Sequence, residues 1–215
     1  MLQCKIFPRA TFVTAVLGLA LVVEHASGQD FPVSPYIDRP LDLPQLESDE
    51  QCPVSIGDMS VVSSDHRYIF GAGGHFYGTG PVYLALSWKP GNRAEAFFDL
   101  DRVPQVSNGY RLKTPWIMNP EYDGEALVRG AQIGTDVSRE VLFAENSQSP
   151  RITAAMILRS SAPGTRILRS EEEAVDAVWG FWPSSMILPA PGCYAIQIDT
   201  ETDSDVVIFE AELSQ

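Results

Sequence analysis

Histidine and aspartate are the first residue types in this 215-residue chain that could do chemistry. His66 follows Asp65, and His75 lies in the glycine-rich stretch 70–80, so both could approach Asp99 in an acid–base or metal site. Nothing in the sequence defines their separation in space, and two surface histidines on loops are the simpler interpretation. A serine-hydrolase site is not expected, because the chain has no Gly-x-Ser-x-Gly elbow.

The cysteines predict a disulfide. Cys4 lies in an N-terminal segment that we expect to be cleaved off, which leaves Cys52 and Cys193. In an exported protein such a pair is most simply a disulfide, with two free buried thiols as the alternative. Paired cysteines are not nucleophiles, so a thiol enzyme is not expected. No histidine lies close to either cysteine in the sequence, so no metal site or other cofactor is expected there.

Aromatic residues are the remaining candidates for binding. Trp179, Phe181 and Trp182 lie just before the closing strands, and Trp116 and Tyr122 flank an Asn-Pro turn. Exposed rings would stack on sugars or receive a partner chain, whereas buried rings would only be core, which is the simpler interpretation. As a ligand surface, the candidate residues are Trp116, Tyr122, Trp179, Trp182 and His75.

The chain is strongly acidic, with a formal net charge of −13. This charge argues against a nucleic-acid or anionic-membrane partner, since both need a basic surface. It suits a cation or a basic partner, although exported proteins are often acidic for solubility alone.

Acidic residues also alternate along one turn near the C-terminus, at Asp199, Glu201, Asp203 and Asp205. Oxygen-rich loops bind calcium, but the glycine and the distal glutamate of an EF-hand loop are missing here. A solvated hairpin tip is therefore the simpler interpretation than a calcium site.

Apolar residues recur at every second position in two neighbouring segments around this turn, which is the period of a half-buried strand. The first set is Tyr194, Ile196 and Ile198, and the second is Val207, Phe209, Ala211 and Leu213. The other side of the first strand carries Cys193, Ala195, Gln197 and Asp199. A polar turn joins the two segments, so they predict an antiparallel hairpin.

The run Pro191-Gly192-Cys193-Tyr194-Ala-Ile-Gln-Ile198, with its hydrophobic final strand, resembles the closing strands of a group of immunoglobulin-like domains. These are bacterial exported β-sandwich domains of unknown function, whose penultimate strand begins Pro-Gly-Cys-(Trp or Tyr). The resemblance covers about the last 35 residues. It implies a two-sheet antiparallel β-sandwich and says almost nothing about activity.

Short segments with β-like patterns predict further strands. They are Met59–Val62, Arg67–Phe70, Pro81–Trp88, Ala94–Leu100, Tyr110–Met118, Glu125–Ile133, Arg139–Ala144, Arg151–Arg159 and Met186–Leu188. Pro115 is expected to end its strand or to place it on a sheet edge. A capping box at Ser170 and Glu173 predicts one short helix near 171–178. The glycine-rich stretch 70–80 predicts a long flexible loop rather than a phosphate site, because a strand follows it instead of a helix.

The N-terminal part predicts export. Residues 1–28 show the three-part pattern of a signal peptide, and their apolar core is too short to span a bilayer, although an uncleaved anchor is the alternative. No other transmembrane segment is predicted. Residues 29–51 form a leader rich in proline and acid, which we expect to be extended and to become ordered near Cys52. Residues 52–215 then make one β-sandwich domain.

These observations together predict an exported, non-catalytic binding or structural module with an unknown protein or glycan ligand. It would act in the periplasm, on the cell surface or outside the cell. The alternatives are a glycan-binding module that uses the exposed aromatic residues, and a hydrolase-like enzyme with a site near His66, His75 and Asp99.

Overall fold

The structure is a computed structural model. It describes residues 36, 38–47, 50–58, 60–61, 75–86, 94–135, 138–145, 151–159 and 179–214. The predicted signal peptide, His66 and the helix predicted near 171–178 lie outside these residues. In the part of the chain that is described, the regular elements are β-strands and one short 3-10 turn, Leu100–Arg102. The prediction of an all-β fold is therefore confirmed.

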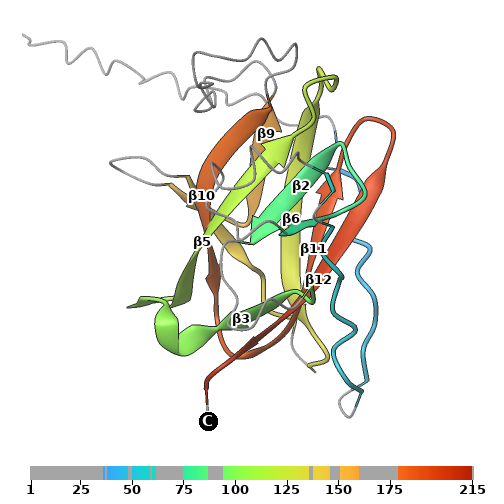
Figure 1. Cartoon of the computed structure of the whole chain (residues 1–215). Helices are drawn as coiled ribbons and strands as arrows, with labels where there is room; N and C mark the ends of the chain where they lie inside the picture. Colours follow the sequence, from blue (N-terminus) through green and yellow to red (C-terminus); the bar gives the residue numbers. More distant parts are fainter. Residues whose placement is uncertain are drawn as a thin grey trace, which may run out of the picture. The chain divides into compact units, whose positions relative to one another are not determined.

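The described strands form two sheets (Figure 1). The first sheet has the order β1 (His75–Tyr77), β2 (Val82–Leu86), β5 (Gly109–Met118), β10 (Gly180–Leu188), β7 (Leu142–Glu145) and β8 (Ile152–Thr153), with β4 (Gln105–Val106) paired to β5. The second sheet has the order β3 (Phe97–Asp99), β12 (Ser204–Glu212), β11 (Gly192–Asp199), β6 (Glu125–Ile133) and β9 (Ala155–Arg159). Strands β11 and β12 pair antiparallel as predicted, whereas β3 runs parallel to β12.

One buried cluster takes side chains from both sheets. The predicted inward positions of β11 and the buried positions of β12 belong to it, and Phe209 of β12 stacks on Tyr194 of β11 at 5.5 Å between ring centroids. The ring of Phe98 meets Phe209 edge-on at 5.2 Å. Leu213 is the exception, because it lies beyond the end of β12 and is 44% exposed. The alternation of apolar residues thus predicts which side of each closing strand faces the shared core. Burial of each large apolar side chain there stabilises the fold by about 1.5–3 kcal/mol.

The expectation that Pro115 ends its strand is wrong, since β5 continues through this proline to Met118, although the proline itself is paired on one side only. Pro115 lies opposite Pro183 of β10, so two residues without an N–H group face each other. The pairing of β5 with β2 includes Met118 to Trp116 and does not continue to Pro115, so Pro115 has no paired residue on the β2 side. Pro115 therefore costs no ladder hydrogen bond to β2.

The glycine-rich stretch is also more structured than predicted. Its His75–Tyr77 part is strand β1, which pairs with β2, and all three of its side chains are buried. Tyr77 joins the shared core, whereas Phe76 packs on the opposite face of the first sheet. Glycine content predicted a loop here, but two large aromatic side chains on opposite faces favour a strand covered on both sides.

Candidate functional site

The outer face of the second sheet, which points away from the shared core, is covered by the leader and the adjoining residues 52–58. Figure 1 shows this segment in blue beside β12 and β11. A second buried cluster forms between the two layers. Its members are Cys52, Ile133, Cys193 and Ala195, with Leu43, Leu46, Val54, Val206 and Ile208 packed against them. This face of the sheet is therefore a contact surface rather than a solvated one.

A disulfide holds the segment on the sheet. Cys52 is bonded to Cys193 of β11, with 5.6 Å between the Cα atoms, as the sequence predicts. Next to it, the backbone N–H of Ser55 donates to the carbonyl of Ile208 at 2.8 Å, and the N–H of Ile208 donates to Oγ of Ser55 at 2.9 Å. The segment is thus joined to β12 as well as to β11.

Gln197 of β11 binds the backbone of the leader. Its side chain is only 1% exposed. Its Oε1 accepts a hydrogen bond from the N–H of Asp42 at 2.7 Å, and its Nε2 donates to the carbonyl of Pro40 at 3.0 Å. Both ends of the amide are therefore satisfied by main-chain groups of the leader, in agreement with the general pairing of buried polar groups.

Asp199 lies at the end of β11 and is fully buried. Its carboxylate accepts from Nη2 of Arg129 at 2.7 Å, from Oγ of Ser204 at 2.7 Å and from Nε2 of Gln197 at 2.8 Å. Nη1 of Arg39, from the leader, lies 3.7 Å away. The solvated-tip interpretation is therefore wrong for Asp199, because this carboxylate is already used by four protein groups.

The connection between β5 and β6 and the tip of the β11–β12 hairpin meet the leader at one end of the domain. Nη1 of Arg39 donates to the carbonyls of Thr200 at 2.9 Å and Asp203 at 3.1 Å, and the guanidinium lies over the ring of Tyr36 at 5.1 Å. On the other side, Oη of Tyr122 donates to the carbonyl of Glu125 at 2.6 Å. Burial raises the pKa of the Tyr122 phenol, and nearby acidic groups add to this effect.

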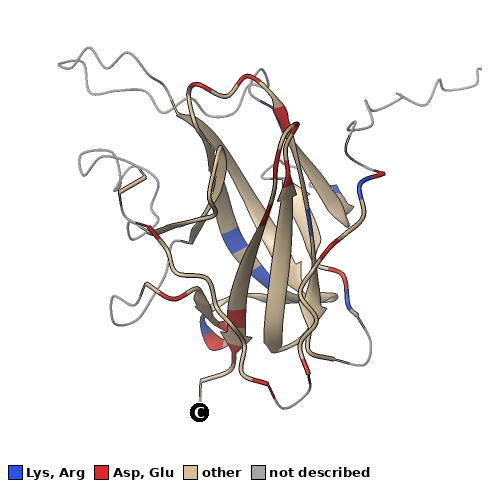
Figure 2. Ribbon diagram, turned by 90° about the vertical axis from the view of Figure 1, so that its right-hand side faces the viewer, with Lys and Arg blue, Asp and Glu red and all other residues tan. Residues whose placement is uncertain are grey.

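Exposed acidic side chains gather around this junction. Figure 2 shows Asp and Glu in red on the loops at the top of the view. We call the following exposed residues the acidic end: Asp38, Glu121, Asp123, Glu201 and Asp203. Strand ends and hydrogen bonds hold the loops that carry them, so the negative charge is presented at defined positions.

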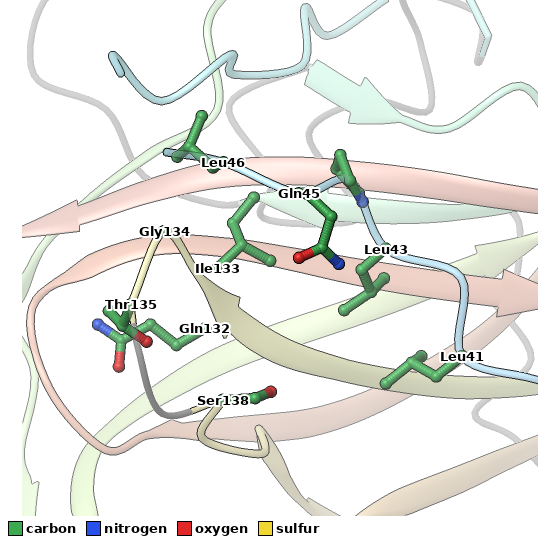
Figure 3. Close-up of a pocket in the computed structure, with 10 residues that line it drawn as sticks. Leu41, Leu43, Gln45, Leu46, Gln132, Ile133, Gly134, Thr135 and Ser138 are labelled. Carbon is green, nitrogen blue, oxygen red and sulfur yellow. The ribbon is translucent and has the colours of Figure 1, made fainter. Parts of the chain in front are cut away.

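A pocket of about 190 Å³ lies between the leader and the end of β6 (Figure 3). Leu41, Leu43 and Ile133 supply apolar walls, and Gln45 and Gln132 are among its polar groups. Nε2 of Gln132 donates to the carbonyl of Pro191 at 3.0 Å. Its Oε1 is buried and has no hydrogen-bond partner among the described residues.

The aromatic candidates fall into different environments. Trp116 is completely buried in the shared core, where its Nε1–H donates to Oγ of Ser184 at 3.0 Å, so its selection as a ligand-binding residue is wrong. Tyr122 and Trp182 are half-buried and pack against the same core. Trp179 is half-buried on the outer face of the first sheet, with its ring 6.2 Å from that of Tyr83. A glycan surface at Trp179 or Trp182 stays a prediction.

The proposed acid–base residues are not assembled in the described part of the chain. His75 is only 7% exposed and lies on β1, whereas Asp99 belongs to β3 of the other sheet. A hydrogen bond from Ser214, with further help from the Asp101 backbone and from Arg102, keeps the pKa of the Asp99 carboxyl below its usual range. The carboxylate of Asp99 is paired with Arg102, whose Nε lies 2.8 Å from Oδ2 of Asp99. This pairing does not suit a general base, which must accept a proton.

No protein-family model matches this chain, and neither a curated protein nor a solved structure was found to be similar to it. Within the described residues, no helix has the length and apolar character needed to cross a membrane. The same residues contain no group of three or more His, Cys, Asp or Glu side chains arranged to hold a metal ion.

Proposed function

We propose that this chain is an exported, non-catalytic binding module built on an immunoglobulin-like β-sandwich, and that it receives a cationic protein segment at the acidic end. The observation that carries the proposal is the junction itself, where Tyr36, Tyr122 and the exposed carboxylates are presented on loops that the strands and Arg39 hold in place. Export is supported by the disulfide, because such bonds persist in oxidising compartments, and by the signal-like N-terminal sequence.

The order of the strands supports the immunoglobulin-like assignment. Strands β2, β5, β10 and β7 follow the order of strands A, B, E and D of that fold, and β6, β11 and β12 follow C, F and G. Tyr194 at the start of β11 bonds through its hydroxyl to the backbone of Ala190, four residues earlier, like the tyrosine corner of immunoglobulin domains. Two features depart from the common pattern, since β7 precedes β9 in the chain and the disulfide joins β11 to residue 52 outside the two sheets.

Loops at the ends of sandwich strands are where such domains usually carry their binding residues. At the acidic end, carboxylates would pair with lysine or arginine side chains. The formal net charge of −13 would speed the encounter with a basic partner. A basic segment of an extracellular or periplasmic protein is therefore the ligand class that fits best.

Neutralising the acidic end tests this function. We expect the substitutions Glu121→Gln, Asp123→Asn, Glu201→Gln and Asp203→Asn together to weaken binding of a fluorescent lysine octapeptide by about tenfold or more at low salt, since each exposed pair is worth about 0.2–1 kcal/mol. Fluorescence anisotropy measures the affinity.

The matched control has the same net charge but keeps the acidic end. It carries Glu47→Gln, Glu50→Gln, Asp101→Asn and Glu140→Gln, which are exposed positions elsewhere in the described chain. Its affinity for the octapeptide should change by about twofold or less, because exposed charges far from the site are screened. Equal losses in both variants would show that only net charge matters and would contradict the proposal, as would turnover of an ester, peptide or glycoside substrate.

A further inference from the structure

We propose that the outer face of the second sheet is a peptide-binding groove that the chain's own leader occupies, and that a partner peptide of the same chemistry can take the leader's place. The partner would be an extended, proline-containing segment with an arginine followed by leucines, like the leader run Arg39-Pro-Leu-Asp-Leu-Pro-Gln-Leu46. This site adjoins the acidic end at the hairpin tip, where Arg39 donates to the carbonyl of Asp203, and its other contacts come from Gln197 and the apolar cluster around Cys193.

The first argument is that the sheet binds the main chain of the leader. The amide of Gln197 accepts from the N–H of Asp42 at 2.7 Å and donates to the carbonyl of Pro40 at 3.0 Å. Neither contact depends on the identity of a leader side chain. Main-chain hydrogen bonds of this kind supply affinity in extended-peptide recognition, while pockets for individual side chains supply specificity.

The second argument is that the groove selects a positive charge at one position. Arg39 donates to the carbonyls of Thr200 and Asp203, and its guanidinium lies 3.7 Å from the buried carboxylate of Asp199. These acceptors match the several N–H donors of a guanidinium better than the single ammonium of lysine. An arginine in a competing peptide would find the same acceptors.

The third argument is that the leader fills the groove incompletely. Leu43 and Leu46 pack on the cluster around Cys193, but Leu41 remains 41% exposed. The pocket of about 190 Å³ stays open between the leader and Ile133, and Oε1 of Gln132 beside it has no partner in the described part of the chain (Figure 3). A segment with a bulkier apolar side chain at this point would bury more surface than the leader does.

The fourth argument concerns competition. Among the described residues, the leader is tied covalently to the sheet only through the neighbouring Cys52, and its other contacts are non-covalent. A tether this short keeps the leader at an effective concentration of about millimolar, so a free peptide binds the native chain weakly. Weakening the leader's own contacts should therefore open the groove to the peptide.

The test uses a fluorescent peptide with the sequence of residues 36–47, titrated into the oxidised full chain. We expect the variant Arg39→Ala with Leu43→Ser to bind this peptide at least about tenfold more tightly than the native chain does, because its own leader competes less. Replacing the peptide's arginine by alanine should remove about tenfold of that affinity, because the acceptors at Thr200 and Asp203 are then left without it. A scrambled peptide of the same composition is the control.

Equal binding of the peptide to the native chain and to the leader variant, or equal binding of the scrambled peptide, would overturn the proposal. Urea denaturation checks that the leader variant is folded. If it is not, the single substitution Arg39→Ala, which lies outside both apolar clusters, replaces it with the same expected direction. A variant neutralised only at Glu121 and Asp123 keeps Gln197, the leucine contacts and the carbonyls that receive Arg39, so it should bind the peptide in a leader-weakened chain normally. The failure of one proposal is thereby distinguished from the failure of the other.

Discussion

Replacing Cys52 and Cys193 together by serine is expected to lower the free energy of unfolding by about 2–5 kcal/mol. The bond closes a loop with a sequence separation of 141 residues, and the entropy that such a loop removes from the unfolded chain corresponds to about 5 kcal/mol. The loss includes the apolar packing between the leader and β11, because the disulfide lies inside that cluster. Urea denaturation of the oxidised native chain and of the double variant measures the difference.

A reducing agent supplies the control for this prediction. It should bring the native chain to nearly the stability of the double-serine variant and leave the variant itself unchanged. The far-UV circular dichroism spectrum should stay that of a β protein in both, since the shared core between the sheets does not include either cysteine. A double variant as stable as the oxidised native chain would show that the bond does not hold the leader on the sheet.

The substitution Asp199→Ala is expected to lower the free energy of unfolding by about 3–5 kcal/mol, because it removes one partner of a buried ion pair. The side chain of Arg129 is only 14% exposed and would keep its charge with no carboxylate beside it. Ser204 and Gln197 would each lose an acceptor as well. Chemical denaturation monitored by tryptophan fluorescence measures the change.

A double-mutant cycle gives the matched comparison. Replacing both partners, as Asp199→Leu with Arg129→Met, should recover most of the lost stability, because no unpaired charge then remains buried. Asp199→Asn should fall between the native chain and Asp199→Ala, since the amide can still accept hydrogen bonds. If Asp199→Ala unfolds within about 0.5 kcal/mol of the native chain, the buried network around β11 is not formed as described.

The strands were predictable wherever apolar residues alternate strictly. The predicted bounds Glu125–Ile133 agree with β6, and the inward residues of β11 and β12 follow from their period of two. Alternation depends only on the pleat of one strand, so it needs no knowledge of neighbouring strands. Pro115 could not be placed in this way, because its tolerance in β5 depends on where the neighbouring strand β2 stops pairing.

The covered outer face could be predicted only in part. Cys193 shares its side of β11 with Gln197 and Asp199, and a cysteine expected to form a disulfide was a sign that this side meets another segment. The position of Cys52 identified that segment. The hydrogen bonds from the Gln197 side chain to the backbone of Pro40 and Asp42 could not be predicted. Contacts to main-chain groups leave no pattern in the sequence, because any residue offers the same donor and acceptor.

The exposure of the aromatic candidates for ligand binding, such as Trp116 and Tyr122, could not be predicted from the sequence either. Both flank one turn, yet Trp116 is completely buried, whereas Tyr122 is half-buried at the edge of the acidic end. The sequence places both aromatic residues near a strand end, but their exposure depends on which residues lie across the sheet. Trp182 lies opposite Trp116 in the β10–β5 register and packs against the same core.

Backbone amide exchange in the oxidised full chain tests most directly whether the leader is seated on the outer face of the second sheet. The N–H groups of Asp42 and Ser55 donate to Gln197 and Ile208, so nuclear magnetic resonance should find both protected well above the rates of an unfolded peptide, with Asp42 losing its protection in Gln197→Ala. Exchange of both amides at unfolded-peptide rates in the oxidised native chain would contradict the account.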